Sequence, residues 1–300
     1  PDPDTEMRDP EHRYKFVRKL GRGGMAIVEL WREIHAEGDE GFVVAKLMHV
    51  GEMTKDERDA ARRESNVLRK MRHPSIVRYI ESWVSSVQDL RDLVIVQQFC
   101  SGGDLSQYIR AARESGSPPG AARVLRWLTQ LTHAMLYCHG RWQIVHRDLK
   151  PQNLFVTQNS ALDEHDAVLK VGDFGLSRRA RDEHVRENGQ VGTPAYCAPE
   201  GGVNAAAPVD IFSAALIILE LLCPPLGTVM ERAQLLEALR GESQGLPAHV
   251  DESLPSYARL VRRMAQRQPH ARPTAVEVLV ELKRIKEETM TMAAQASGWT

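Results

Sequence analysis

The sequence predicts an α+β protein with two parts: a small β-rich lobe containing one main helix, and a larger, mostly helical lobe. Apolar runs of strand type dominate the chain up to residue 100, whereas longer helical patterns dominate after it. The polar, glycine-containing residues 101–104 separate the two styles. The length of 300 residues suits two structural units or one large two-lobed domain.

The small lobe is expected over residues 14–100, after a polar leader at residues 1–13. Its strand-like runs are FVRKLGRGG, AIVELW, GFVVAKLM, IVRYIESWV and DLVIVQQFC. The charged segment 57–71 carries Ala61, Val67 and Leu68 at helical spacing, which predicts an amphipathic helix. His73-Pro74 ends this helix, because a proline disfavours helical backbone in the residue before it.

The larger lobe is expected over residues 101–287, followed by a tail at residues 288–300. Residues 121–138 and 214–222 are apolar-rich helical patterns, and a final helix is expected near residues 275–288. The sequence Arg272-Pro273-Thr274 places a good capping residue before that last helix. Between the helical segments lies a loop-rich centre at residues 146–200.

The composition disfavours several classes of protein. Thirty-nine basic and 40 acidic residues give a formal charge of −1, which argues against a general nucleic-acid or polybasic membrane binder. The longest apolar stretch, residues 214–223, contains Glu220 and is about half the length of a membrane-spanning helix. The N-terminal residues carry no apolar signal core. Four widely spaced cysteines suggest reduced thiols and a cytoplasmic, or else nuclear, protein.

A turn between the first two predicted strands carries Gly21, Gly23 and Gly24. Glycines let backbone amides approach a phosphate closely, although most glycine-rich turns are only turns. Lys46 lies among apolar neighbours in the third run, where a lysine needs an anionic partner, and Glu64 of the next helix is a candidate. Taken alone, each residue is better explained as an ordinary turn or surface residue.

The central loop changes that balance, because its polar residues suit phosphoryl transfer. In HRDLKPQN, Asp148 and Asn153 lie five residues apart with Lys150 between them, and Asp173 follows in DFG. Carboxylate and amide oxygens are the ligands that Mg²⁺ prefers. Asp148 would accept a hydroxyl proton, and Lys150 would neutralise a transferring phosphate. With APE at residues 198–200, this order of motifs is too specific to be a coincidence.

These motifs resemble those of the eukaryotic protein kinases from about Tyr14 to Leu282. The resemblance implies a two-lobed kinase fold with ATP bound at the cleft, Mg²⁺ as cofactor and a protein as acceptor. It implies catalytic roles for Asp148, Lys150, Asn153, Lys46 and Glu64. It implies that the Mg²⁺ ligands are Asn153 and Asp173. The implied nucleotide-binding positions are Gly21, Gly23, Val28, Ala45, Lys46, Gln98, Cys100, Leu154 and Asp173.

The resemblance also assigns positions outside the nucleotide site. Asp210 in VDIFS resembles the buried aspartate that holds the catalytic loop, and Arg272 resembles the partner of Glu200 in APE. Lys150 together with Thr193 in VGTPAYCAPE resembles the serine/threonine class of kinases. These features predict transfer to serine or threonine hydroxyls of protein substrates.

The chain departs from the family pattern at two places. Ala26 replaces the third glycine of the phosphate loop, which predicts a stiffer loop and weaker nucleotide closure. Residues 178–192 contain no serine, threonine or tyrosine, although phosphorylation of this segment activates many relatives. One hypothesis is that Glu187, or else Asp182 or Glu183, supplies the negative charge for Arg147 and Arg178. The alternative, that these are solvated loop charges, is equally consistent with the sequence.

Two kinase groups share features with the chain. IVRYIESW, QQFCSGGDLSQYI and the C-terminal RPTAVEVL segment resemble the NIMA-related kinases, which we favour. GQVGT, VDIFS and ELLCPPLGTVMERAQLLEALR resemble the kinases of the alpha subunit of translation initiation factor 2, a stress-kinase alternative. A pseudokinase scaffold is a further alternative, although the complete catalytic set favours catalysis. The expected partners are ATP and protein substrates, without nucleic acid or membrane.

Overall fold

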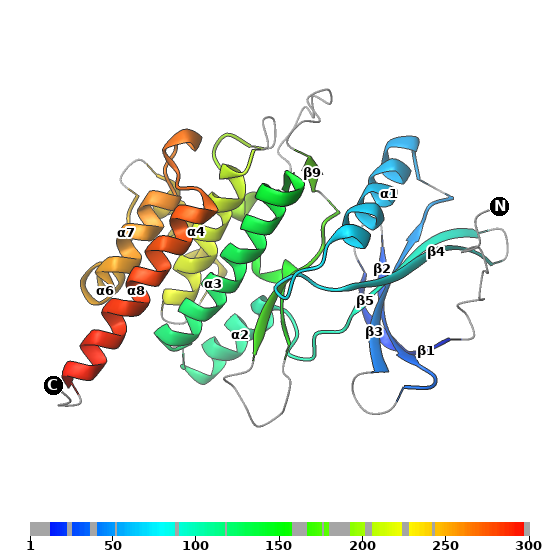
Figure 1. Cartoon of the computed structure of the whole chain (residues 1–300), viewed down its shortest axis with the longest axis horizontal. Helices are drawn as coiled ribbons and strands as arrows, with labels where there is room; N and C mark the ends of the chain where they lie inside the picture. The colour runs from blue at the N-terminus through cyan, green and yellow to red at the C-terminus, as the bar shows by residue number, and fades with distance from the viewer. Residues whose placement is uncertain are drawn as a thin grey trace. The chain divides into compact units, whose positions relative to one another are not determined.

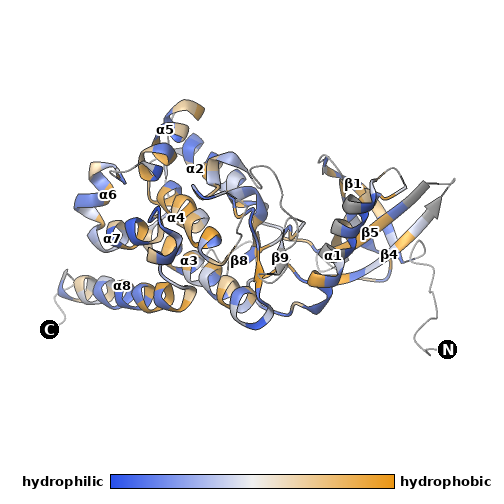
Figure 2. Ribbon diagram, turned by 90° about the horizontal axis from the view of Figure 1, so that it is seen from above, coloured by the Kyte–Doolittle hydropathy of each residue, from blue (hydrophilic) through white to orange (hydrophobic). Residues whose placement is uncertain are grey.

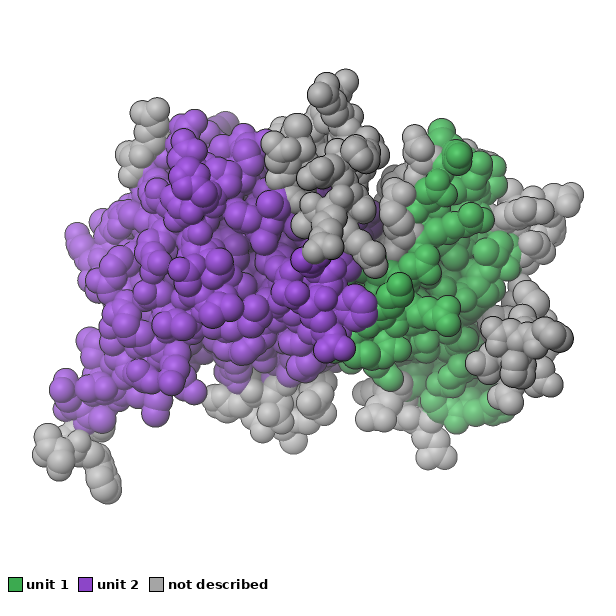
Figure 3. All heavy atoms as spheres, turned by 45° about the horizontal axis from the view of Figure 1, so that its top comes forward, with its two compact units in different colours: residues 1–72, 77–99 green, residues 73–76, 100–300 purple. Residues whose placement is uncertain are grey.

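The computed structural model describes residues 13–22, 26–36, 41–51, 53–87, 90–117, 119–157, 167–175, 177–179, 193–201, 206–223, 228–241 and 244–296. The chain forms two compact units, drawn in green and purple in Figure 3. Unit 1 comprises residues 1–72 and 77–99, and unit 2 comprises residues 73–76 and 100–300. The element content of the two units confirms the predicted α+β class.

Unit 1 is a five-stranded antiparallel sheet with one helix (Figure 1). The strand order is β1-β2-β3-β5-β4. The elements are β1 (Tyr14–Arg22), β2 (Ile27–Glu33), β3 (Phe42–His49), α1 (Lys55–Lys70), β4 (Tyr79–Val87) and β5 (Leu90–Gln98). Each predicted strand run therefore contributes a strand, and the predicted helix is α1.

The core of unit 1 follows the alternation of side chains along the strands. Val43 and Ala45 of β3 are buried, and they pack with Val94 and Val96 of β5. Tyr14 of β1 joins this cluster. On α1, the buried residues Ala61, Ser65 and Leu68 lie at helical spacing, and Ser65 is hydrogen-bonded to Ser82 of β4. One face of α1 is thereby attached to the sheet.

Unit 2 consists mainly of helices, which Figure 1 shows side by side. They are α2 (Leu105–Ser115), α3 (Ala121–Leu136), α4 (Pro208–Leu222), α5 (Val229–Arg240), α6 (Ala248–Ser253), α7 (Pro255–Met264) and α8 (Ala275–Ala296). Helix α4 is mostly apolar in Figure 2, and it packs against α3, α5 and α7. All its residues from Val209 to Leu222 are buried, so α4 is the centre of this hydrophobic core.

The loop-rich centre of unit 2 contains two small antiparallel sheets. One pairs β6 (Ile144–Val145) with β9 (Arg178–Arg179), and the other pairs β7 (Leu154–Thr157) with β8 (Val168–Val171). Short 3-10 turns lie at Pro151–Asn153 and Pro194–Tyr196. These elements bring residues that are distant in sequence to the same part of unit 2.

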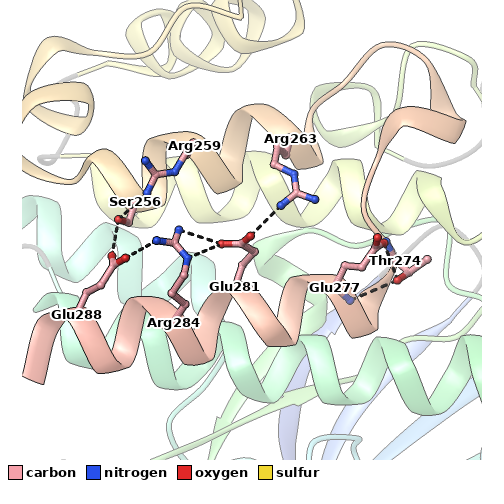
Figure 4. A network of polar contacts seen from close by, with 8 residues as sticks. All are labelled: Ser256, Arg259, Arg263, Thr274, Glu277, Glu281, Arg284 and Glu288. Atoms are coloured by element: carbon pink, nitrogen blue, oxygen red, sulfur yellow. Dashed lines mark hydrogen bonds and ion pairs between the residues drawn. The ribbon is translucent and has the colours of Figure 1, made fainter.

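Helices α7 and α8 are joined by polar contacts along their exposed faces (Figure 4). Glu281 of α8 accepts hydrogen bonds from Arg263 of α7 and from Arg284, both at 3.0 Å. At the start of α8, Thr274 and Glu277 cap each other's backbone N–H groups, which confirms the predicted capping residue. Exposed ion pairs of this kind contribute only about 0–1 kcal/mol each.

Several helix boundaries differ from the sequence predictions. Helix α4 begins at Pro208, six residues before the predicted 214, because proline is well accommodated in the first turn of a helix. Helix α8 continues beyond residue 288 to Ala296. The predicted helix 121–138 changes at Tyr137 into a π-helical turn, Tyr137–Trp142. No helix of the described ranges is long and apolar enough to cross a membrane.

Candidate active site

The backbone of His146 and Arg147 is held by Asp210, a buried residue in the first turn of α4. Its carboxylate accepts hydrogen bonds from the amides of His146 at 2.8 Å and Arg147 at 2.9 Å. It is also 2.8 Å from Nε2 of His139, which lies in the π-helical turn. Arg147 has a φ of +68°, a region that non-glycine residues rarely adopt, so these bonds hold the loop in a strained conformation.

The pKa of Asp210 reflects two opposed effects. Burial disfavours the carboxylate, but the hydrogen bond and charge of His139, together with His146, outweigh burial and lower the pKa below its ordinary value. Asp210 is therefore an ionised group at neutral pH, and its carboxylate is available as the acceptor for the loop amides. The role predicted for Asp210, holding the catalytic loop, is confirmed by these contacts.

His146 fixes the other side of the loop. Its Nε2 lies 2.9 Å from the carbonyl oxygen of Gly172, and its Nδ1 lies 3.3 Å from the amide of Asp148. A carbonyl only accepts and an amide only donates, so in these two contacts Nε2 donates and Nδ1 accepts. Its ring also packs on Phe174, with 4.8 Å between the ring centroids. His146 thus connects the loop with the residues on both sides of Asp173.

The carboxylate of Asp148 is oriented by four hydrogen-bond donors. Oδ1 accepts from the amide and the hydroxyl of Thr193, both at 2.9 Å. Oδ2 accepts from Nζ of Lys150 at 2.7 Å and from Nδ2 of Asn153 at 3.0 Å. The residues are brought together by a turn of the chain at 148–153 and by the 3-10 turn that begins after Thr193. A carboxylate with donors on both oxygens has a fixed plane and direction.

The direction of the contacts at Thr193 follows from the chemistry of Lys150. The ammonium of Lys150 can only donate, and it lies 2.7 Å from Oγ1 of Thr193 as well as close to Asp148. Since Oγ1 accepts from Lys150, its own hydrogen points to Oδ1 of Asp148. Asp148, Lys150 and Thr193 therefore form a closed ring of hydrogen bonds around one carboxylate.

The two predicted Mg²⁺ ligands come from neighbouring backbone segments of unit 2. The amide of Gly172, the residue before Asp173, donates to the carbonyl of Asn153 at 2.9 Å. Nδ2 of Asn153 donates to Asp148, so the side-chain oxygen of Asn153 is the atom that would bind a metal ion. Asp173 is exposed and has a φ of +56°. A carboxylate and an amide oxygen are a donor set that fits Mg²⁺.

A transition-metal site requires several His, Cys, Asp or Glu side chains close together. In the part of the chain that the structure describes, no group of three or more His, Cys, Asp and Glu side chains is placed to hold a metal ion. Two oxygen ligands suit Mg²⁺, which keeps several waters and binds substrate phosphates in addition to protein groups.

Four of the predicted nucleotide positions of unit 1, Gly21, Val28, Ala45 and Lys46, lie on its first three strands. Lys46 of β3 is half-buried and lies opposite Val28 of β2 and Ile95 of β5. Ala45, its neighbour, is fully buried. Gly21 of β1 is paired with Val28, and a side chain added at Gly21 would meet open space. Gly23 lies outside the described residues, as does the side chain of Glu64, although its backbone belongs to α1.

The remaining predicted nucleotide positions lie on either side of the unit boundary. Gln98 ends β5, where its amide donates to the carbonyl of Arg78 at 2.8 Å. Cys100 and Leu154 of unit 2 are both buried. Burial raises the pKa of the Cys100 thiol to about 12, so Cys100 is a neutral, apolar residue at this position.

Glu200 and Arg272 form the predicted ion pair. Nη1 and Nη2 of Arg272 donate to Oε1 and Oε2 of Glu200 at 2.5 and 2.7 Å. The same guanidinium donates to the carbonyls of Gln266, Pro208 and Arg267, and it lies over the ring of Phe212. The side chain of Arg272 is completely buried, so the pair is architectural.

Sequence reasoning did not identify several residues around the site. His139 was not predicted as a partner of Asp210. A histidine is a suitable partner for a buried carboxylate, but the two residues are 71 positions apart and no motif links them. Arg232 and Arg240 of α5, which contact residues 194–197, were not predicted either. The proposed acidic substitutes at Asp182, Glu183 and Glu187 lie outside the described residues, as does the side chain of Arg178.

Comparison with known proteins identifies the family. The model of the protein kinase domain matches residues 14–282. The chain is 30% identical to serine/threonine-protein kinase Nek11 of Homo sapiens over 294 residues, which cover 96% of this chain and 43% of Nek11. It is 31% identical to Nek2 of Homo sapiens over 275 residues, covering 89% of this chain and 58% of Nek2.

These similarities agree with the predicted resemblance to NIMA-related kinases and do not favour the initiation-factor kinase alternative. Probable serine/threonine-protein kinase nek2 of Dictyostelium discoideum is 30% identical over 274 residues, which cover 89% of this chain and 62% of that protein. The chain spans about two fifths of the length of the Nek11 relatives that it matches. The chain belongs to the protein kinase domain family, and within it resembles the NIMA-related serine/threonine kinases.

Proposed function

We propose that the protein is an active, ATP-dependent serine/threonine protein kinase. The observation that carries this proposal is the ring of hydrogen bonds among Asp148, Lys150 and Thr193. A pseudokinase needs no such arrangement, whereas phosphoryl transfer depends on positioning a hydroxyl against the terminal phosphate of ATP. The family match and the similarity to Nek serine/threonine kinases support the same assignment.

In the proposed reaction, Asp148 orients the acceptor hydroxyl and takes up its proton as the bond to phosphorus forms. Both oxygens of Asp148 are already fixed by donors, so the carboxylate meets the substrate without reorganising. Lys150 carries a positive charge 2.7 Å from the same carboxylate, where it would stabilise the negative charge on the transferring phosphoryl group. The bond between phosphorus and the ADP oxygen breaks, and ADP leaves.

The resemblance to protein kinases assigns nucleotide-binding positions to each unit. Lys46 and the glycine turn of unit 1 would bind the phosphates, and Val28, Ala45 and Leu154 would contact the base. Asn153 and Asp173 would hold Mg²⁺, which when bound supplies positive charge to neutralise the phosphate oxygens. In this assignment Lys46 and the metal ligands bind ATP, whereas Asp148 and Lys150 act on the acceptor.

The proposed partners are ATP and protein substrates with serine or threonine acceptors. We also propose a cytoplasmic or nuclear location, which the cysteines support. All four are free thiols buried in the protein, as expected of a chain that folds without disulfides.

The experiment that tests the proposal is transfer of ³²P from γ-labelled ATP, with Mg²⁺, to a panel of peptides and proteins. The panel includes the alpha subunit of initiation factor 2, and Asp148→Asn is the matched control because it keeps the shape of the side chain. We expect labelled phosphoserine or phosphothreonine with the wild-type chain and none with the control. Thermal stabilisation by MgATP without any transfer would instead support a nucleotide-binding scaffold.

A further inference from the structure

Helix α5 ends in an arginine that binds the backbone following Thr193. Nη1 of Arg240 donates to the carbonyls of Pro194 at 2.8 Å and Ala195 at 3.1 Å, and Nη2 donates to the carbonyl of Cys197. The Arg240 side chain is 16% exposed, and its Nε lies 4.0 Å from Oε2 of Glu237, a mostly exposed side chain. The guanidinium is therefore held mainly by carbonyl dipoles.

These contacts matter because a short 3-10 turn leaves its last carbonyls without partners. In the turn after Thr193, the amide of Tyr196 donates a hydrogen bond to the carbonyl of Thr193. The hydroxyl of Ser213 in α4 satisfies the carbonyl of Tyr196 at 2.8 Å. The other three carbonyls of residues 194–197 each accept a hydrogen bond from Arg240. The guanidinium presents five N–H groups in one plane on three nitrogens, so it can donate to several carbonyls at once.

The first turn of α5 holds the same segment through a side chain. Arg232 donates to Glu220 of α4, with 2.5 Å between Nε and Oε1, and to the hydroxyl of Tyr196. The Tyr196 hydroxyl in turn donates to Oε2 of Glu220 at 2.5 Å. Glu220 and Tyr196 are buried, and the positive charge of Arg232 balances the negative charge of Glu220. Helix α5 thus contacts the segment at two points, one on the side chain of Tyr196 and one on the backbone.

We propose that Arg240 is a positioning residue for phosphoryl transfer. By fixing the carbonyls at 194, 195 and 197, it fixes the backbone directly after Thr193, and so holds Thr193 against Asp148 and Lys150. Arg240 does not touch the reacting atoms in this account, and it acts only through the segment that it binds. The inference rests on the proposed kinase function. It adds that the rate of phosphoryl transfer depends on a residue of α5.

The test uses Arg240→Ala and Arg240→Lys in the full chain. Lysine keeps the charge but presents one nitrogen, so it can restore only part of the contact. The control is Arg263→Ala, which removes an exposed arginine paired with Glu281 on α8. For each variant, kcat and KM are measured for an acceptor peptide and for ATP, below the unfolding temperature. Hydrogen–deuterium exchange of the amides at 195–200 is measured in the same samples.

We expect Arg240→Ala to lower kcat by about 10-fold or more, because small displacements of positioned groups have large effects on rate. The KM for ATP should stay within about twofold, since ATP binding uses other residues. Exchange at 195–200 should become about 10-fold faster, as expected for a segment that opens locally. Arg240→Lys should lie between wild type and Arg240→Ala, and Arg263→Ala should match wild type.

Two results would overturn the inference. One is an unchanged kcat in Arg240→Ala, whether or not exchange at 195–200 becomes faster, because the segment would then not control catalysis. The other is a fall in kcat with unchanged exchange, because the loss would then not act through the segment. If the wild-type chain itself transfers no phosphate, the proposed kinase function fails, and the exchange measurement alone decides whether Arg240 fixes the segment.

Discussion

The hydroxyl of Thr193 lies 2.9 Å from Oδ1 of Asp148, although the two residues are 45 positions apart in the sequence. The backbone amide of Thr193 donates to the same oxygen at 2.9 Å. Lys150 donates to the threonine hydroxyl and to the other carboxylate oxygen. Thr193 therefore connects the segment that ends at APE with the proposed catalytic residue. Its position fixes the direction of Oδ1 of Asp148.

Replacing Thr193 by valine should lower kcat by at least about 10-fold, because valine keeps the shape but loses the hydroxyl that links Lys150 to Asp148. Thr193→Ser keeps that hydroxyl and should retain most of the rate. Steady-state kinetics with a peptide acceptor and saturating MgATP measure both variants. Equal rates for valine and threonine would show that the hydroxyl is dispensable.

Replacing Arg272 by alanine should lower the free energy of unfolding by about 3 kcal/mol or more, because it leaves Glu200 and three backbone carbonyls without their donor. Urea denaturation of the purified chain gives this difference. Arg263→Ala, which breaks an exposed pair with Glu281, should cost less than about 1 kcal/mol. The account of Arg272 is wrong if the two variants are equally stable.

Asp210 should make stability depend on pH in the acidic range. Its pKa is lower in the folded protein than in the unfolded chain, so the folded state binds fewer protons and stability rises with pH. The contribution is complete above the unfolded-state pKa of about 3.9 and is lost as pH falls through the lower, folded pKa. The stability difference between wild type and Asp210→Asn should therefore shrink as pH falls below about 4.

Urea denaturation of both proteins at a series of pH values from 6 downward measures this difference. A difference that stays constant across the series would show that the Asp210 carboxylate does not titrate with folding. His139→Gln provides a second variant, because glutamine keeps a donor for Asp210 but removes the charge. Its stability should depend on pH less than that of wild type, since the folded pKa of Asp210 moves back toward its ordinary value.

The thiols should resist alkylation while the protein is folded. Burial raises the pKa of Cys100 and of Cys223 to about 12, and it also raises the pKa of Cys138 and Cys197. A protonated, buried thiol is a poor nucleophile at pH 8. Mass spectrometry after iodoacetamide treatment should show little labelling in buffer and four labelled cysteines in urea. Rapid labelling of Cys100 in the native protein contradicts its assigned burial.

The sequence predicted the strands of unit 1 well because their side chains alternate between a buried and a less buried face, as at Val43 and Ala45. It predicted Asp148, Lys150 and Asn153 because the chemistry is confined to one short motif. The pairing of Glu200 with Arg272 was predicted only through the family resemblance. Helix ends were less certain, since Pro208 and the exposed residues after 288 carry no strong signal for where a helix begins or ends.

The contacts of α5 were beyond sequence reasoning for a physical reason. An arginine in the last turn of a helix is expected from the helix dipole alone, so Arg240 gives no sign of a distant partner. Its acceptors are backbone carbonyls 43 to 46 residues earlier, and a carbonyl is present at every residue. The π-helical turn at Tyr137–Trp142 could not be predicted either, because the sequence pattern of α3 continues into it without a break.

The most direct test of the central claim is the rate of a single turnover with saturating MgATP and peptide, compared between wild type and Asp148→Asn. Saturation removes differences in binding, so the rate reports on the transfer step alone. The account predicts a fall of at least about 100-fold in the variant, with MgATP affinity unchanged, because asparagine cannot take up the hydroxyl proton. Comparable single-turnover rates in the two proteins would contradict the role of Asp148 and the proposed mechanism with it.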